Sequence, residues 1–500
     1  MDNKSPTKDK EYSKDVVSLQ SGENLTALSR TFSRQKELEL ENKIQKLEKS
    51  SKSYIMLLVG LVISIMFKGM DVNSNQKYIQ SILHGEASDL ATVELFTNLM
   101  SAAVPVFGYL LDNFYPFRVR TGPYVVFASL VASLSMILVW AFPLSMRSFT
   151  AVNTLYACAC TFNAVITQGL LVLKTKMDVQ IFDLKKEQES LKNEAQRQRR
   201  VSHIDGSAPE MVVERDRIGI KLYITYGILS GIFKGIFTGL SGVIVDNLPI
   251  KMVYLVLAAP GILMAAFVLL FIKEPKEKKL FSKSQDLLLT LKSFLKVFLS
   301  PLILLPAILK LITEMIPDVQ EAIMFILINE GGWNYSQLGG AAALAMLCVF
   351  IAVLQLRRLT KFIRFELLFL IGTLSTAYSR LIEVPQIFSS IPTYAFMTSY
   401  TLQALLNSAA ELFTTIPLFG RFNTLIPDGF ESTGANIMKS LIEVGKTVSV
   451  YGTKKELDYF GVVNGYYSRV KAPMIVNLAI SVITCFVCPF FLIGGMKKQK

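Results

Sequence analysis

Seven charged side chains stand inside long apolar stretches of the sequence, where an ionisable group is costly and usually faces a polar cavity or an opposite charge. The lysines could present positive charge to a small anionic molecule. The carboxylates of Asp71 and Glu314 could carry a proton. The seven residues predicted to bind a substrate or to couple its movement to protons are Lys68, Asp71, Lys234, Lys310, Glu314, Lys439 and Glu443.

Two of these lysines have a carboxylate four residues further along the chain. Lys310 precedes Glu314 and Lys439 precedes Glu443, and residues four apart are neighbours on one face of a helix. Each pair could therefore neutralise itself and serve only the structure of its own helix. The sequence leaves both interpretations open, and the deciding observation is whether Lys234, Lys310 and Lys439 converge on one cavity.

The apolar stretches indicate an all-α membrane protein. Of the 500 residues, 51% are hydrophobic and 18% are charged, with a mean hydropathy of +0.42, which is too apolar for a soluble globular chain. Each stretch can cross a hydrocarbon core of about 30 Å. The stretch 429–450 is barely hydrophobic, so neighbouring helices must shield it from lipid. About twelve spanning helices are predicted, at roughly 54–76, 90–112, 121–142, 148–173, 218–243, 250–272, 297–323, 336–356, 364–381, 391–418, 429–450 and 471–495.

The positions of lysine and arginine orient these helices. Basic residues concentrate in the tail before the first helix and in the connections 174–217, 273–296 and 357–364, whereas 79–89 and 324–336 contain none. The positive-inside rule therefore predicts that both termini are cytosolic. The predicted order is an N-terminal tail with a short amphipathic helix, helices 1–4, a charged helical loop, helices 5–6, a linker, helices 7–12 and a C-terminal tail. These parts cover residues 1–53, 54–173, 174–217, 218–272, 273–296, 297–495 and 496–500.

Several classes of function do not fit the residues present. The net charge of +13 lies between the apolar stretches rather than on a compact basic domain, so nucleic-acid binding is not expected. The sequence contains no phosphate-binding G-x-x-x-x-G-K-[ST] segment, no Ser/His/Asp set and no metal-ligand cluster, and only two histidines. We therefore predict no enzyme activity, no metal site and no cofactor.

A Gly-x-x-x-Asp segment ends the second predicted helix on its cytosolic side. Gly108 would let another helix approach closely, and Asp112 would lie on the same face. That carboxylate could pair with Arg120 or lie against the positive N-terminus of a neighbouring helix. A contact of this kind can hold one state of a moving protein and release another. The predicted gating group also includes Arg118 and Glu431, the latter at the start of the eleventh helix.

Two six-helix halves and this turn, with its two arginines, resemble the major facilitator superfamily. A narrower resemblance is to the folate–biopterin transporter family, whose motifs three segments match in the same order. They are Pro105, Gly108, Asp112, Arg120, Pro123 and Tyr124; then Pro317, Ala322, Phe325, Trp333, Leu338 and Gly339; then Pro427, Gly429, Glu431, Thr433 and Ser440. The resemblance implies a major facilitator fold and secondary transport of folates, pterins or related organic anions, often with protons.

Departures from the family pattern keep other interpretations open. Val104 stands where the family has a lysine, and Arg120 alone represents a run of three basic residues, so a nucleoside, amino acid or other metabolite would also fit. A non-transporting membrane scaffold or sensor with the same fold is the alternative from another class. Its loop 174–217 and amphipathic residues 36–52 would bind cytosolic partners, and Ser202, which follows two arginines, would suit a kinase. The expected location is the plasma membrane.

Overall fold

The computed structural model of the chain is almost entirely α-helical. It divides into two compact units, unit 1 (residues 1–53 and 176–211) and unit 2 (residues 54–175 and 212–500). The residues described are 35–49, 54–65, 70–114, 119, 121–197, 208–272, 298–318, 332–359, 369–375, 431–462 and 467–497, with short pieces between 292 and 426.

Unit 1 contains the helix of residues 35–49 and the last part of α6 (Met146–Arg197). Leu40 and Ile44, which lie one helical turn apart, are both buried. Two ion pairs accompany this apolar stripe, Lys36–Glu187 at 3.2 Å and Lys185–Glu48 at 2.9 Å. The charged side chains are about half exposed, and exposed pairs of this kind contribute at most about 1 kcal/mol each. The buried apolar side chains therefore stabilise this unit more than its charges do.

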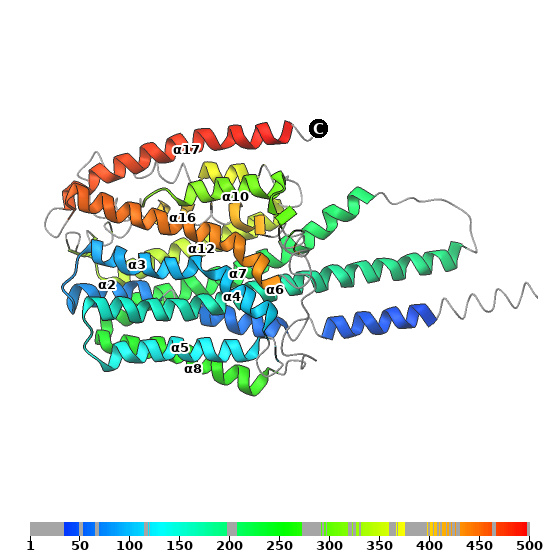
Figure 1. The fold of residues 1–500 in the computed structure, drawn as a ribbon, viewed down its shortest axis with the longest axis horizontal. Coiled ribbons are helices and arrows are strands. Elements are labelled where there is room, and N and C mark those ends of the chain that lie inside the picture. Colours follow the sequence, from blue (N-terminus) through cyan, green and yellow to red (C-terminus); the bar gives the residue numbers. More distant parts are fainter. Residues whose placement is uncertain are drawn as a thin grey trace, which may run out of the picture. The chain divides into compact units, whose positions relative to one another are not determined.

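The described helices of unit 2 fall on the predicted apolar stretches, and Figure 1 shows them side by side along one common direction. In the N-terminal half they are 54–65, α2 (Asp71–Ser81), α3 (Ala87–Ala102), α4 (Val104–Asn113), α5 (Gly122–Ala141), α6, α7 (Ala208–Asn247) and α8 (Ile250–Phe271). In the C-terminal half they are α10 (Pro301–Glu314), α12 (Tyr335–Leu359), α16 (Glu431–Phe460), the short 3₁₀ helix η3 (Tyr467–Val470) and α17 (Lys471–Lys497).

Prolines explain where two helices differ from their predicted lengths. The second spanning segment is divided at Ala103, between α3 and α4, because Pro105 has no N–H to donate to the carbonyl four residues earlier. Helix α10 ends at Glu314 rather than at residue 323. Here Pro317 disfavours the helical conformation of the residue before it.

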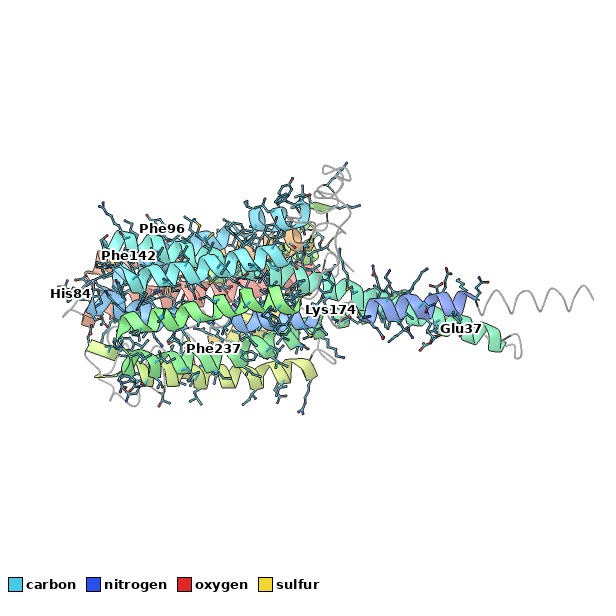
Figure 2. All side chains as sticks on the ribbon, turned by 90° about the horizontal axis from the view of Figure 1, so that it is seen from below. Glu37, His84, Phe96, Phe142, Lys174 and Phe237 are labelled. Carbon is cyan, nitrogen blue, oxygen red and sulfur yellow. The ribbon has the colours of Figure 1, made fainter. Side chains whose placement is uncertain are left out.

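Five of the described helical segments are long and apolar enough to cross a membrane, and the total of twelve remains a prediction. The five are Ala87–Asn113, Gly122–Ala141, Met146–Ser190, Lys221–Asn247 and Ile250–Phe271. Large apolar side chains such as Phe127, Leu263 and Leu269 are exposed on α5 and α8, as are Phe96 of α3 and Phe142 at the end of α5, which Figure 2 labels. A surface of this kind suits contact with lipid.

Two large apolar clusters and a small one around Leu309 and Phe369 lie among the described residues of unit 2. One large cluster surrounds Tyr78, whose ring stacks on Phe149 at 4.6 Å between centroids and meets Tyr254 edge-on at 5.5 Å. The other large cluster includes Leu111 and Met438. Each large cluster contains residues from both halves of the sequence, so the two halves share closely packed apolar side chains, and van der Waals packing of this kind favours helix association in lipid.

Candidate functional site

The carboxylate of Asp112 lies against the first turn of α16. Its Oδ1 accepts a hydrogen bond from the backbone N–H of Ser432 (3.1 Å), and its Oδ2 accepts from the N–H and the hydroxyl of Thr433 (2.7 Å each). The first N–H groups of a helix lack intrahelical partners and carry partial positive charge. We call Asp112, Ser432 and Thr433 the Asp112 clamp. Of the two contacts predicted for Asp112, the one with a helix N-terminus is formed, while Arg120 lies outside the described residues.

Two glycines allow α16 to come this close. A Cβ added to Gly108, one turn before Asp112, would lie 2.9 Å from both the carbonyl oxygen of Ser432 and the Cα of Thr433. A Cβ added to Gly169 of α6 would collide with the hydroxyl of Ser432 and lie 3.1 Å from its Cβ. The close approach predicted at Gly108 is therefore present. Gly169 and Ser432 were not among the predicted gating residues. For Gly169, the sequence signal was a glycine inside an apolar stretch, which favours close helix packing.

Helix α16 is bonded to the N-terminal half of the sequence at further points along its length. The hydroxyl of Ser440 donates to the carbonyl of Ala102 at 2.5 Å. Near the far end, the Nζ of Lys454 donates to the hydroxyl of Thr92 at 2.8 Å. The first turns of the helix are buried, and Asn436 is fully so. Neighbouring helices therefore shield this weakly hydrophobic segment, as its composition predicts.

Lys310 and Glu314 form the ion pair that their spacing predicts. The Nζ of Lys310 lies 2.5 Å from the Oε1 of Glu314, and Lys310 is only 5% exposed. The pair faces α16, since a Cβ added to Gly445 would lie 2.8 Å from the Cβ of Glu314. A buried charge needs such a partner, and removing one member leaves the other uncompensated. Lys234, in contrast, is exposed, so these two predicted lysines lie in different surroundings.

The predicted residue Asp71 begins a polar helix, α2, that is largely buried. Asp71 is 8% exposed. Gln76, five residues further on, is fully buried, and neither the oxygen nor the nitrogen of its amide has a hydrogen-bond partner within the described structure. An unpaired buried amide is costly, so this stretch of α2 is suited to bind water or a polar ligand.

The remaining predicted residues lie mainly on α16. Lys439 and Glu443 are half-buried there. Glu431 is the first residue of the helix, where a negative charge is favoured. The predicted residues outside the described part of the chain are Lys68, Arg118, Arg120 and Ser202.

A small polar cavity lies among the helices of the N-terminal half. Its lining includes Ser129 and Ser133 of α5 and Tyr156, Cys160 and Asn163 of α6. The Nδ2 of Asn163 donates to the hydroxyl of Ser129 at 3.2 Å, while its buried Oδ1 has no partner among the described residues. The cavity admits molecules of the size of water, which could satisfy that oxygen. Within the described residues, no group of three or more His, Cys, Asp or Glu side chains could hold a metal ion.

Comparison with known proteins gives a family and a fold. The sequence model of the BT1 family matches residues 223–494, more than half of the chain. The crystal structure of a point mutant of the nucleoside transporter NupG is similar, with a TM-score of 0.61 and 10% identity over 88% of this chain and 99% of that one. A second NupG structure has a TM-score of 0.54 and 11% identity over 88% and 98%. No curated protein sequence matches. At this level of identity the likeness to NupG shows the fold alone.

Proposed function

Because the chain belongs to the BT1 family, the folate–biopterin transporters of the major facilitator superfamily, we propose that it moves a small organic anion of the folate or pterin type by alternating access. The family and the fold make it a membrane transporter. In this superfamily two halves rock around a site near the middle of the membrane. The substrate class, coupling to protons and the plasma-membrane location belong to the proposal.

The Asp112 clamp is the observation that carries the proposal. Asp112 ends a helix of the N-terminal half, and Ser432 and Thr433 begin a helix of the C-terminal half. Rocking of the halves must therefore stretch or break these hydrogen bonds. The connections rich in lysine and arginine belong to the same end of the helices as Asp112. The positive-inside rule assigns that end to the cytosol. The Asp112 clamp thus acts as a cytosolic gate, with Glu431 beside it.

The buried charges are the candidate contacts for the anion and for a proton. Lys310 is positive and buried, and Glu314 holds it at 2.5 Å. An anionic substrate that reaches this pair would compete with Glu314 for the lysine, and a proton on Glu314 would release the lysine to the substrate. Asp71, buried at the start of α2, is the second candidate carrier of a proton.

Uptake of labelled folate and biopterin into proteoliposomes, with and without an inward-directed proton gradient, tests this function. Glu314→Gln is expected to remove the stimulation by the proton gradient, because the side-chain amide of glutamine does not take up and release a proton near neutral pH as a carboxylate can. Lys310→Met is expected to weaken uptake about tenfold or more at low substrate concentration. Lys234→Met, at an exposed lysine, is the matched control. No uptake of either compound by protein shown to be folded would remove the folate and pterin assignment.

The same proteoliposomes distinguish two alternative functions from the transport of folates or pterins. The likeness to a nucleoside transporter in fold makes labelled nucleosides the next compounds to test. The pairing of Lys310 within its own helix and the exposure of Lys234 favour a scaffold or sensor whose loop 174–217 and N-terminal helix bind cytosolic proteins. Turnover of any compound would exclude the scaffold. Binding without turnover, across folates, pterins and nucleosides, would favour it.

A further inference from the structure

A second carboxylate at the end of a helix joins α7 to α12. Asp246, in the last turn of α7, accepts through Oδ1 from the backbone N–H of Tyr335 (3.2 Å) and through Oδ2 from the N–H (2.7 Å) and the hydroxyl (2.5 Å) of Ser336. Tyr335 is the first residue of α12, so the carboxylate again meets the positive end of a helix. We call Asp246, Tyr335 and Ser336 the Asp246 clamp.

The Asp246 clamp repeats both the sequence and the packing of the Asp112 clamp. Gly242 precedes Asp246 by four residues, as Gly108 precedes Asp112, and an asparagine follows each aspartate. A Cβ added to Gly242 would overlap the carbonyl oxygen of Tyr335. Each asparagine donates to the carbonyl four residues back in its own helix. The pattern Gly-x-x-x-Asp-Asn thus ends two helices, and each end receives the start of another helix.

The glycine ridge of α7 extends this contact along α12. A Cβ added to Gly235 would lie 2.8 Å from the Cβ of Met346, and one added to Gly239 would lie 3.0 Å from the Cβ of Ala343. From the other side, a Cβ added to Gly339 would lie 2.9 Å from the carbonyl of a residue of α7. Small residues let two backbones pack this closely. The clamp therefore terminates a long and close crossing of two helices.

The two clamps lie at opposite ends of unit 2. The hydroxyl of Tyr335 donates to Gln80 at 2.8 Å, and Gln80 lies just before His84, which Figure 2 shows at one end of the bundle. Gly169, which packs on the Asp112 clamp, lies just before Lys174, which the same figure shows toward the other end. A motion that opens one end of the bundle can therefore leave the clamp at the other end intact.

Helix α2 braces the Asp246 clamp from the side. The Nζ of Lys77 donates to the carbonyl of Val245 and lies over the ring of Tyr335, 5.8 Å from its centroid, a favourable arrangement for a cation. The side-chain amide of Asn73 donates to the hydroxyl of Ser241 at 2.6 Å. The clamp region thus links three helices, α2, α7 and α12, and α2 begins with the candidate proton carrier Asp71.

We propose that Asp246 is a gating residue, and that its clamp closes the end of the transport path opposite to the Asp112 clamp. Each clamp joins a helix that precedes residue 272 to a helix that follows residue 297. Rocking of the two halves must break one clamp while it keeps the other. The inference rests on the alternating access proposed above. A state with both clamps formed, as here, is closed at both ends, and a substrate enters only when one is released.

Hydrogen–deuterium exchange on the full-length protein in lipid nanodiscs tests this inference. Asp246→Asn keeps the shape of the side chain but removes its charge and one acceptor. We expect amide exchange in residues 335–340 to become about fivefold faster, while residues 431–436 stay as protected as in the unaltered protein or become more protected. Asp112→Asn should instead speed exchange at residues 431–436, by a larger factor because that carboxylate is buried, and leave residues 335–340 protected. Asn247→Ala, whose parent side chain bonds to its own helix, should change neither end.

Two outcomes would overturn the proposal: faster exchange at both ends in Asp246→Asn, which would make Asp246 a general support of the fold, or unchanged exchange at residues 335–340. If that variant does not fold, Gly242→Ala displaces α12 while it keeps the carboxylate. Its control is Gly340→Ala, because a Cβ there meets nothing within 4 Å. The measurement needs no substrate, so an absence of folate or biopterin uptake alone would refute the substrate class and not the gate.

Discussion

The Asp112 and Asp246 clamps have the same parts and differ in their exposure to water. Each carboxylate binds two backbone N–H groups and one hydroxyl at the start of a helix. Asp112 is 2% exposed, whereas Asp246 lies on the surface. Hydrogen bonds are stronger where water is excluded, and their loss there leaves donors unpaired. With equal numbers of bonds, burial decides which clamp is stronger, and we expect the Asp246 clamp to open first.

The largest expected effect is that of Asp112→Asn. The substitution leaves buried donors at the start of α16 without a full set of acceptors, at a cost of about 3 kcal/mol in the local opening of that end. Asp246→Asn should cost less, about 1 kcal/mol, because water replaces the lost acceptor. Amide exchange at residues 431–436 and 335–340 measures both free energies.

The control at the Asp112 end is Asn113→Ala, which removes a side chain that bonds to the carbonyl of Tyr109 in its own helix. It should leave exchange at residues 431–436 unchanged. Equal costs for Asp112→Asn and Asp246→Asn would contradict the view that burial separates the two clamps.

Alanine substitutions at the glycines should have the next largest effect. At Gly108 a new Cβ would press on the backbone of α16, and overpacking of this kind costs about 2 kcal/mol. At Gly169 it would meet first the hydroxyl of Ser432, which can rotate away, so the cost should be smaller. In detergent, Gly108→Ala should therefore unfold at a lower temperature than Gly169→Ala. Gly340→Ala should unfold at the same temperature as the unaltered protein. The reverse order would show that α16 does not press on α4 as closely as the contact distances indicate.

Ionic strength should have the smallest effect and act on one clamp only. Exposed charges are screened over about 10 Å at 0.1 M salt and about 3 Å at 1 M, whereas buried groups are screened much less. Raising the salt from 0.1 to 1 M should weaken the Asp246 clamp by about 0.5 kcal/mol and leave the Asp112 clamp unaffected. Exchange at residues 335–340 should rise while that at 431–436 stays constant. A parallel rise at both ends would mean that the two carboxylates have similar access to solvent.

Local signals predicted the parts of the site that depend on one helix. The four-residue spacing of Lys310 and Glu314 predicted their ion pair, because neighbours on a helix face meet whatever surrounds them. Gly108 predicted the close approach of another helix, and a helix N-terminus was one of the two partners predicted for Asp112, the other being Arg120. The same pattern stands at Gly242 and Asp246, but no local signal in the sequence specifies that the start of α12 is its partner.

By itself the sequence determined that the chain is a helical membrane protein, where most apolar stretches lie, and that the segment from Glu431 onward must be shielded. These follow from hydropathy and from spacing along a single helix, which are local properties. Only the tertiary structure decided that α16 meets Asp112 and that α12 meets Asp246. The partners are far apart in the chain, 320 positions in the case of Asp112 and Ser432. A hydrogen bond between them depends on distance and direction in space, which no spacing along one helix specifies.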